Sequence, residues 1–151
     1  MGRSEWGPPI WKLFHTFAEK VKEEDFNNIK QQLISFIIQI CNVLPCPYCA
    51  QHAKLFWKNT KLDTIITKSD LQKVLFVFHN SVNKRTLKLT FNYENLNATY
   101  NNKNLINEYN HFCSKFNTNG NMTLLSDSFH RKRLLNSLKI WLIANINCFE
   151  R

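Results

Sequence analysis

The chain has 151 residues, enough for one domain with a sizeable core, and it carries 20 Lys and Arg against 11 Asp and Glu, a formal net charge of +9. Only 3 residues are glycine and 4 are proline, which argues against a turn-rich β-sandwich, collagen or a glycine-rich phosphate loop. The composition therefore predicts an all-α protein. No stretch reaches the roughly 18–20 apolar residues of a membrane span, and the N-terminus lacks the apolar segment of a signal peptide.

Apolar residues recur at helical spacing through the first third of the chain. The expected helices span residues 9–22, 26–43 and 47–57. Pro9 and Pro47 each suit the first turn of a helix, because proline has no backbone N–H to donate there. Pro47 would leave Cys46 at the N-cap of the third helix.

A fourth helix is expected to begin at Ser69, where Ser69 and Gln72 have the spacing of a capping box. Its apolar face consists of Leu71, Val74, Leu75, Phe78 and Val82. A short helix is expected over residues 93–100. Four helices joined by short loops predict a compact four-helix bundle, with the short helix as a fifth element.

The last third of the chain changes in character near residue 100. Residues 101–123 are rich in Asn and predict a loop or a weak helix, whereas residues 126–147 again have helical spacing. The apolar residues of that last segment are Phe129, Leu134, Leu135, Leu138, Trp141, Leu142 and Ile146. We therefore expect a core over residues 1–100 and a helical extension over residues 101–151. The extension would pack on the core, covering the bundle or building a dimer interface.

Five cysteines are present, at positions 41, 46, 49, 113 and 148. An odd number without a signal peptide argues against a disulfide scaffold. The close pair Cys46-Pro47-Tyr48-Cys49 at a helix start has a chemical logic, because the helix N-terminus stabilises a thiolate and two intervening residues allow an exchangeable disulfide. The sequence thus indicates thiol–disulfide chemistry, with Cys41 in the core. Cys113 and Cys148 are expected to be free thiols, with a disulfide between them as the alternative if the fold brings them together.

Two other functions remain open at this point. The dithiol with His52 could form part of a zinc site that staples a basic, nucleic-acid-binding helical module. Cys-Pro-Tyr-Cys is also typical of glutaredoxins, which need a β-strand directly before the motif, and residues 33–40 could be read as a buried strand. The helical spacing that begins at Phe26 favours a helix instead.

Two further motifs flank the dithiol. Upstream lies W-x-x-x-H-x-x-A, formed by Trp11, His15 and Ala18, and downstream lies the segment H-N-x-V-N that begins at His79. With the C-x-x-C between them, these blocks resemble, over residues 5–100, the Erv/ALR family of FAD-dependent sulfhydryl oxidases. The resemblance implies a four-helix bundle with a short fifth helix and an FAD cofactor at one end.

The resemblance also implies roles for individual residues. Cys46 and Cys49 would be the redox-active pair, with Cys46 more exposed and Cys49 facing the flavin. The residues implied to bind FAD are Gly7, Pro8, Trp11, His15, His52, His79, Asn80, Val82, Asn83, Lys84, Lys88 and Tyr93. Pro8 stands where cellular members often have Arg.

Partners are implied in the same way. The substrate would be a protein dithiol, such as a small thioredoxin-like or dithiol relay protein, and O2 would accept the electrons and become H2O2. The chain lacks a separate shuttle Cys pair, as virus-encoded members do. A homodimer that binds no nucleic acid is expected, located in the cytoplasm, or in the host cytoplasm or virion if the protein is viral.

Overall fold

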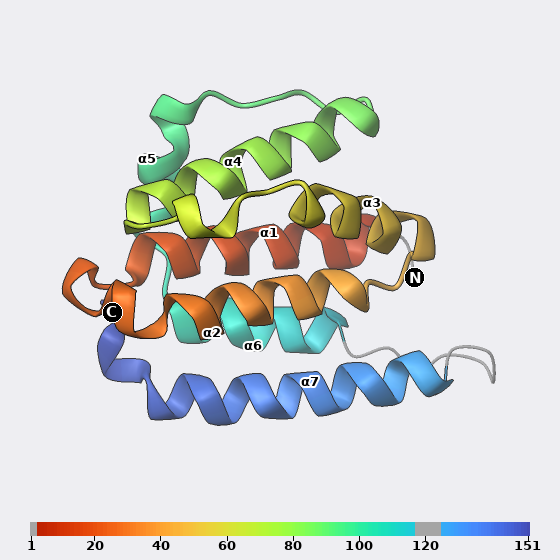
Figure 1. The fold of residues 1–151 in the computed structure, drawn as a ribbon. Helices are drawn as coiled ribbons and strands as arrows, with labels where there is room; N and C mark the ends of the chain where they lie inside the picture. The colour runs from red at the N-terminus through yellow and green to blue at the C-terminus, as the bar shows by residue number, and fades with distance from the viewer. Residues whose placement is uncertain (1–2, 117–124) are drawn as a thin grey trace.

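The computed structural model describes residues 3–116 and 125–151 (Figure 1). Its helices are α1 (Arg3–Lys20), α2 (Glu23–Asn42), α3 (Pro47–Lys58), α4 (Lys68–Arg85), α5 (Leu96–Tyr100), α6 (Leu105–Phe116) and α7 (Leu125–Ala144), with short 3-10 turns η1 (Leu62–Thr64), η2 (Tyr93–Asn95) and η4 (Ile146–Cys148). Within these ranges the only β-type pairing is one isolated bridge, between Val21 and Phe149. The prediction of an all-α bundle is confirmed. None of the helices described is long and apolar enough to cross a membrane.

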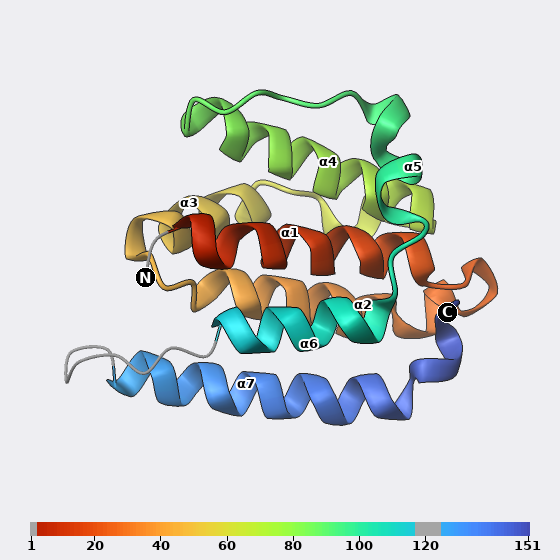
Figure 2. The same ribbon diagram turned by 180° about the vertical axis from the view of Figure 1, so that it is seen from behind.

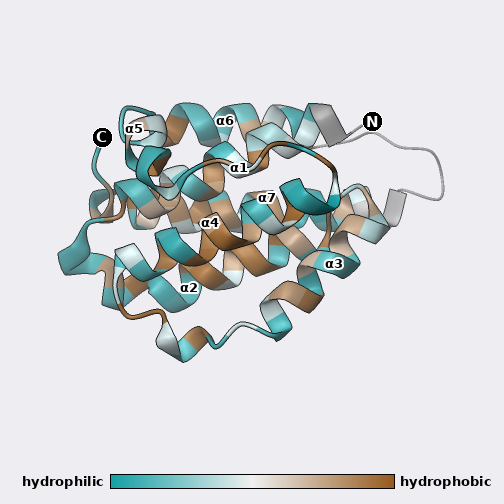
Figure 3. Cartoon of the chain, turned by 90° about the horizontal axis from the view of Figure 1, so that it is seen from above, coloured by the Kyte–Doolittle hydropathy of each residue, from teal (hydrophilic) through white to brown (hydrophobic). Residues whose placement is uncertain are grey.

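Helix α1 is the centre of the bundle. It packs against α4 and α5 on one side and against α6 on another, while α2 packs against α3 and α7. Figures 1 and 2 show this order from opposite sides, with α6 lying alongside α1. Leu13, Phe14 and Phe17 of α1 are completely buried. Figure 3 shows hydrophobic segments gathered toward the middle of the bundle, so burial of apolar surface around α1 is the main driving force of the fold.

The first helix begins earlier than its proline pattern indicates. Pro8 and Pro9 lie inside α1, not in its first turn as predicted for Pro9. A proline in a helix interior removes a backbone hydrogen bond and destabilises it by about 3 kcal/mol. Trp6 and Ile10 are four residues apart and both are buried in the core, which offsets that cost.

The capping box of α4 also lies elsewhere than predicted. The N-cap is Thr67, whose hydroxyl accepts from the Asp70 backbone N–H (3.2 Å), while Asp70 Oδ2 accepts from the N–H groups of Thr67 and Ile66 (both 3.0 Å). A carboxylate can accept two backbone donors at a helix start and benefits from the helix dipole. Gln72, the predicted partner of Ser69, instead donates to the Ala18 carbonyl at 3.1 Å.

Part of the Asn-rich segment, predicted to be a loop or a weak helix, is the regular helix α6. Residues 117–123 of that segment lie outside the described residues. The buried residues of α6 are Leu105, Tyr109, Phe112 and Phe116. The three steps between them, of four, three and four residues, place these side chains on the face toward α1, whereas Ile106 and the Asn residues of the helix are exposed.

Helix α7 packs its apolar face on α2. The Trp141 indole donates to Gln32 Oε1 at 2.8 Å, and its ring lies 5.4 Å from that of Phe36. Two residues assigned to this face are not buried in it: Phe129 is 60% exposed, and Ile146 lies beyond the helix end and is 36% exposed. After α7 the chain returns to the α1–α2 turn, where the Glu150 N–H donates to the Lys20 carbonyl.

Helix α4 ends in a left-handed turn without glycine. Leu87 has φ 60°, and the Lys88 N–H donates to the Asn83 carbonyl (2.8 Å) while the Leu87 N–H donates to the Lys84 carbonyl (3.3 Å). This is the Schellman hydrogen-bond pattern, in which glycine is usual. The reversal directs Lys88 and the following strand-like segment back along α4.

Because Leu87 is 94% exposed, it contributes little packing to offset the cost of a left-handed backbone, about 1–2 kcal/mol for a residue with a Cβ. We expect Leu87→Gly to raise the free energy of unfolding by up to about 1 kcal/mol, the larger entropy of glycine in the unfolded chain cancelling part of the gain. Urea denaturation measures this change. Leu89→Gly, at an equally exposed position without positive φ, is the control and should not stabilise; equal effects of both variants would contradict the strain at Leu87.

Candidate active site

The two cysteines of the dithiol form a disulfide at the start of α3, with Cα atoms 5.2 Å apart. Cys46 is the N-cap, as predicted, and its sulfur accepts a hydrogen bond from the Cys49 backbone N–H at 3.1 Å. Cys46 is partly exposed, whereas Cys49 is only 6% exposed. The pair therefore has an outer sulfur stabilised by a helix N-terminus and an inner sulfur in contact with the core.

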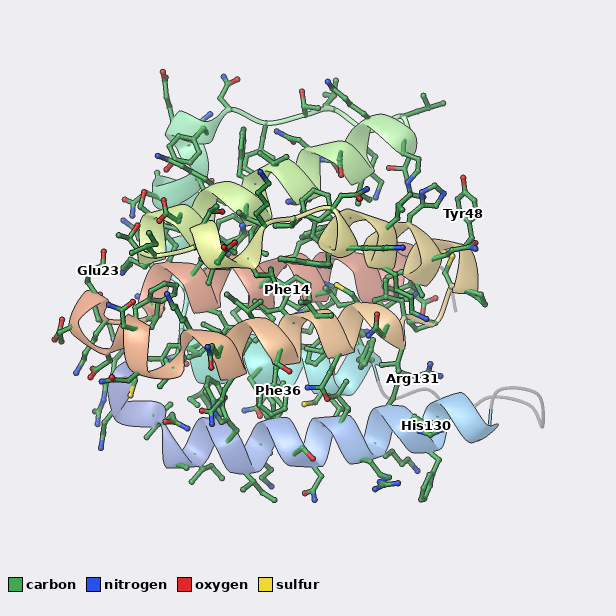
Figure 4. The ribbon with its side chains drawn as sticks, in the orientation of Figure 1. Phe14, Glu23, Phe36, Tyr48, His130 and Arg131 are labelled. Carbon is green, nitrogen blue, oxygen red and sulfur yellow. A yellow bond between two sulfur atoms is a disulfide. The ribbon has the colours of Figure 1, made fainter. Side chains whose placement is uncertain are left out.

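The outer side of the disulfide is marked by Tyr48. Its side chain is 59% exposed and points away from the bundle in Figure 4. The Arg85 guanidinium lies 5.4 Å from the centre of the Tyr48 ring, and the His52 ring lies 4.3 Å from it. A substrate that approaches Cys46 therefore meets an aromatic side chain held between a cation and an imidazole.

The inner side of the disulfide faces a cavity of about 250 Å³. Side chains from α1, the end of α2, α3, α4 and α5 line it, and Cys49 is among them. Its apolar walls include Trp11, Phe78 and Val82. The cavity is smaller than the roughly 300–1,000 Å³ of typical ligand pockets, so it would enclose only part of a dinucleotide.

Two histidines and two aromatic rings form a continuous stack between α1, α4 and α5. The Trp11 and His79 rings are parallel within 9° with centres 4.1 Å apart. His15 Nε2 and His79 Nδ1 are 2.9 Å apart, so one ring donates an N–H to the other. Tyr100 stacks on the far side of His15 at 4.6 Å. This stack gives the cavity a flat aromatic wall.

Both histidines are held neutral. Burial, followed by the neighbouring His79, lowers the pKa of His15 to about 3. Burial, followed by the charge of Lys88, lowers the pKa of His79 to about 4. At neutral pH the pair therefore makes a neutral hydrogen bond and adds no charge to the wall.

The positive charge of the cavity comes from Lys12, Arg85 and Lys88. Arg85 Nη1 is buried and has no hydrogen-bond partner, and leaving a buried donor unsatisfied costs about 1–3 kcal/mol or more. An anion at this point would satisfy it. FAD, the cofactor implied by the sequence motifs, combines an anionic diphosphate with flat rings, so the donor set and the aromatic wall fit that group.

The structure brings together most of the residues predicted to bind the cofactor. Those that line the cavity are Gly7, Pro8, Trp11, His79, Val82, Asn83 and Lys88. His15 lies behind His79 and positions its ring. Four others do not reach the cavity: Asn80, His52, Lys84 and Tyr93.

Each of these four has another environment. Asn80 holds the returning segment, since its side chain donates to the Phe91 carbonyl (3.0 Å) and accepts from the Phe91 N–H (3.2 Å). Tyr93 packs its ring against that of Phe76, and His52 packs against Tyr48 on the outer side. Lys84 is exposed to solvent. A role for them at the cofactor stays a prediction.

Among the cavity residues outside the predicted binding set are Lys12, Arg85 and Tyr100. Arg85 follows Phe78 by seven residues and Val82 by three, so helical spacing alone puts it on the same face of α4. This spacing agrees with the positive charge expected near the FAD diphosphate around Lys84, Arg85 and Lys88. Lys12 and Tyr100 carry no comparable signal, because Tyr100 depends on the turn that brings α5 back to α1.

The remaining thiols do not join the redox pair. Cys41, Cys113 and Cys148 are free. Cys41 also lines the cavity, but burial raises its pKa to about 12, so it stays a protonated, unreactive thiol at neutral pH.

The structure argues against the glutaredoxin and zinc-site alternatives. The segment before Cys46 is the helix α2, not the strand that a glutaredoxin needs. Across residues 3–116 and 125–151 no three His, Cys, Asp or Glu side chains are grouped so that they could hold a metal ion. The zinc-stapled alternative therefore lacks a ligand set in this part of the chain.

The lowered histidine pKa values predict acid sensitivity. Unfolded histidine has a pKa near 6.5, so between about pH 6.5 and 4 the unfolded chain binds more protons than the folded one, and stability falls as the pH is lowered. Replacing His79 with Gln should reduce the slope of unfolding free energy against pH in this window by up to about 1.4 kcal/mol per pH unit. Urea titrations at several pH values measure it. The exposed His111→Gln is the control, and matching slopes for wild type and His79→Gln would contradict the prediction.

Comparisons with known proteins agree with this geometry. The model of the Erv1/Alr family matches residues 8–117. A protein named FAD-linked sulfhydryl oxidase, from African swine fever virus (isolate Pig/Kenya/KEN-50/1950), is 34% identical over 83 residues, which are 55% of this chain and 69% of that protein. Protein 347L of Invertebrate iridescent virus 6 is 31% identical over 86 residues, 53% of this chain and 78% of that protein. No solved structure matches the chain. The chain belongs to the Erv1/Alr family.

Proposed function

We propose that this protein is an FAD-linked thiol oxidase that converts protein dithiols to disulfides, with O2 as the terminal electron acceptor and H2O2 as its product. The single observation that carries the proposal is the placement of the Cys46–Cys49 disulfide between solvent and the cavity. FAD, when bound, would supply the two-electron redox chemistry that amino-acid side chains lack. Family membership and the relatives named FAD-linked sulfhydryl oxidase support the same function.

Cys46 is the sulfur that a substrate thiolate would attack. It is partly exposed, and in-line attack on it expels Cys49 as a thiolate and forms a mixed disulfide between Cys46 and the substrate. The second thiolate of the substrate then attacks the substrate sulfur of the mixed disulfide and expels Cys46 as a thiolate. The Cys49 N–H and the N-terminus of α3 stabilise the departing Cys46 thiolate, which makes it a good leaving group. The substrate leaves with a disulfide, and the enzyme holds a dithiol.

Cys49 connects this exchange to the cavity. Because it is 6% exposed and lines the cavity, its thiolate is shielded from external thiols. The neutral Trp11–His79 wall and the Arg85 guanidinium would bind and orient the cofactor. No side-chain general base is required, because the thiolates carry the exchange; the lowered pKa values of His15 and His79 also make both rings weak bases.

The identity of the partners is part of the proposal. The relatives are viral proteins, and a small thioredoxin-like or dithiol relay protein in the host cytoplasm or virion would present the substrate thiols. A homodimer is also expected. The apolar face of α7 is buried against the same chain, so a dimer would have to form through another surface.

The division of roles between the cysteines is tested by Cys46→Ala and Cys49→Ala. Each variant should lose oxygen consumption with dithiothreitol at least about a hundredfold, because neither can form the exchangeable disulfide. Each should keep the yellow colour of bound flavin, since neither side chain holds the cofactor. Visible spectra and an oxygen electrode measure both properties, and loss of flavin from both variants would mean that the pair is structural.

The role of Arg85 is tested by Arg85→Met, which keeps length but removes the charge. A hydrogen bond to a charged group contributes about 1.5–3 kcal/mol, so the dissociation constant for FAD should rise roughly 10- to 100-fold. Flavin fluorescence titration of the apoprotein measures it. Lys73→Met, on an exposed position of α4 away from the cavity, is the matched control. Unchanged affinity in Arg85→Met would remove this residue from the proposed cradle.

A further inference from the structure

Arg131 is the largest side chain that is fully buried among the described residues, with 1% of its surface exposed. It belongs to α7, beyond the residues 8–117 that the family model matches. Burying a guanidinium is unfavourable unless hydrogen bonds and a favourable potential replace water. Its environment in the fold supplies both.

The guanidinium reaches the end of α2. Nη1 donates to the Val43 carbonyl at 3.1 Å, and Val43 is the C-cap residue of that helix. Carbonyls at the end of a helix lack partners within the helix and carry a partial negative charge, which a cation stabilises. The last turn of α2 has no basic residue of its own, so α7 provides the cation.

A second contact fixes the guanidinium from the side of α6. Its central carbon lies 5.9 Å from the centre of the Phe116 ring, and Phe116 is completely buried. Figure 4 shows Arg131 between α7 and the helices above it. The side chain thus joins three elements: α7, α6 and the end of α2.

The carbonyl that Arg131 binds is three residues before the redox-active pair. Leu44, the next residue, lines the cavity, and Cys46 is the N-cap of α3. Fixing Val43 therefore limits how far this short connection can shift the outer sulfur relative to the inner one.

We propose that Arg131 is a positioning residue of the redox site: by holding the Val43 carbonyl it keeps Cys46 in register with Cys49. The C-terminal helix thereby acts on the disulfide across the bundle. The importance of this for catalysis rests on the proposed oxidase function, but the effect on the disulfide itself does not. Loosening the connection lowers the effective concentration of one thiol for the other and so favours the dithiol form.

The test uses the full-length chain with Arg131→Met and Arg131→Lys. Each protein is equilibrated with mixtures of reduced and oxidised glutathione, and the Cys46–Cys49 state is read by alkylation and mass spectrometry. We expect Arg131→Met to shift the equilibrium about tenfold toward the dithiol, and Arg131→Lys about threefold, because an ammonium keeps the charge but not the planar donor fork. Arg133→Met is the matched control, since Arg133 is exposed on the same helix, and it should not shift the equilibrium.

An unchanged equilibrium in Arg131→Met, with only a lower melting temperature, would overturn the proposal and leave a purely structural role. If Arg131→Met does not fold, Arg131→Lys decides in the same way. Oxygen consumption and flavin content are measured in parallel. A wild-type protein that fails to bind FAD would refute the proposed function, while the glutathione equilibrium would still test Arg131.

Discussion

The burial of the C-terminal half of α1 is the constraint on which the other features depend. Every residue from Leu13 to Val21 is buried, so each polar side chain in that stretch needs a partner inside the protein. His15 pairs with His79 on α4, Glu19 accepts from the Asn97 side chain of α5, and Lys20 donates to the main-chain carbonyls of Asn101 and Arg151. These pairings fix α4 and α5 against α1, and the His15–His79 pair also supports the wall of the cavity.

The redox pair gains its two-sided character from this arrangement. The short connection after α2 places the N-terminus of α3 at the mouth of the cavity, so one helical turn separates a sulfur that meets solvent from one that meets the core. A disulfide in the middle of a helix would lack the N-terminal dipole, and one in a loop would lack the buried inner sulfur. Helix packing and thiol chemistry therefore impose the same position on Cys46 and Cys49.

Sequence patterns predicted the features that depend on the spacing of neighbouring residues. They missed those that depend on contacts between distant segments. The first four helices, the N-cap role of Cys46 and the grouping of Trp11 with His79 follow from periodicity and motif order. Helix α6 was left open as a loop or a weak helix because the surrounding segment is rich in Asn, although the apolar residues of the helix are regularly spaced. Asn80 was assigned to the cofactor, but the left-handed turn at Leu87 brings Phe91 within its reach, and no sequence pattern announces such a turn when glycine is absent.

The net charge of +9 is compatible with a nucleic-acid partner or with a solvated basic surface, yet two of the arginines act within the fold. Arg131 binds the carbonyl end of α2, where the helix itself provides the negative potential. Arg85 lies beside the cavity with a buried nitrogen that no protein acceptor satisfies, and a small anion can. Arg131 thus fixes the segment that enters the redox site, and Arg85 creates the demand for the ligand that the site would hold. These two arginines, unlike most of the basic residues of the chain, act in the interior around the disulfide.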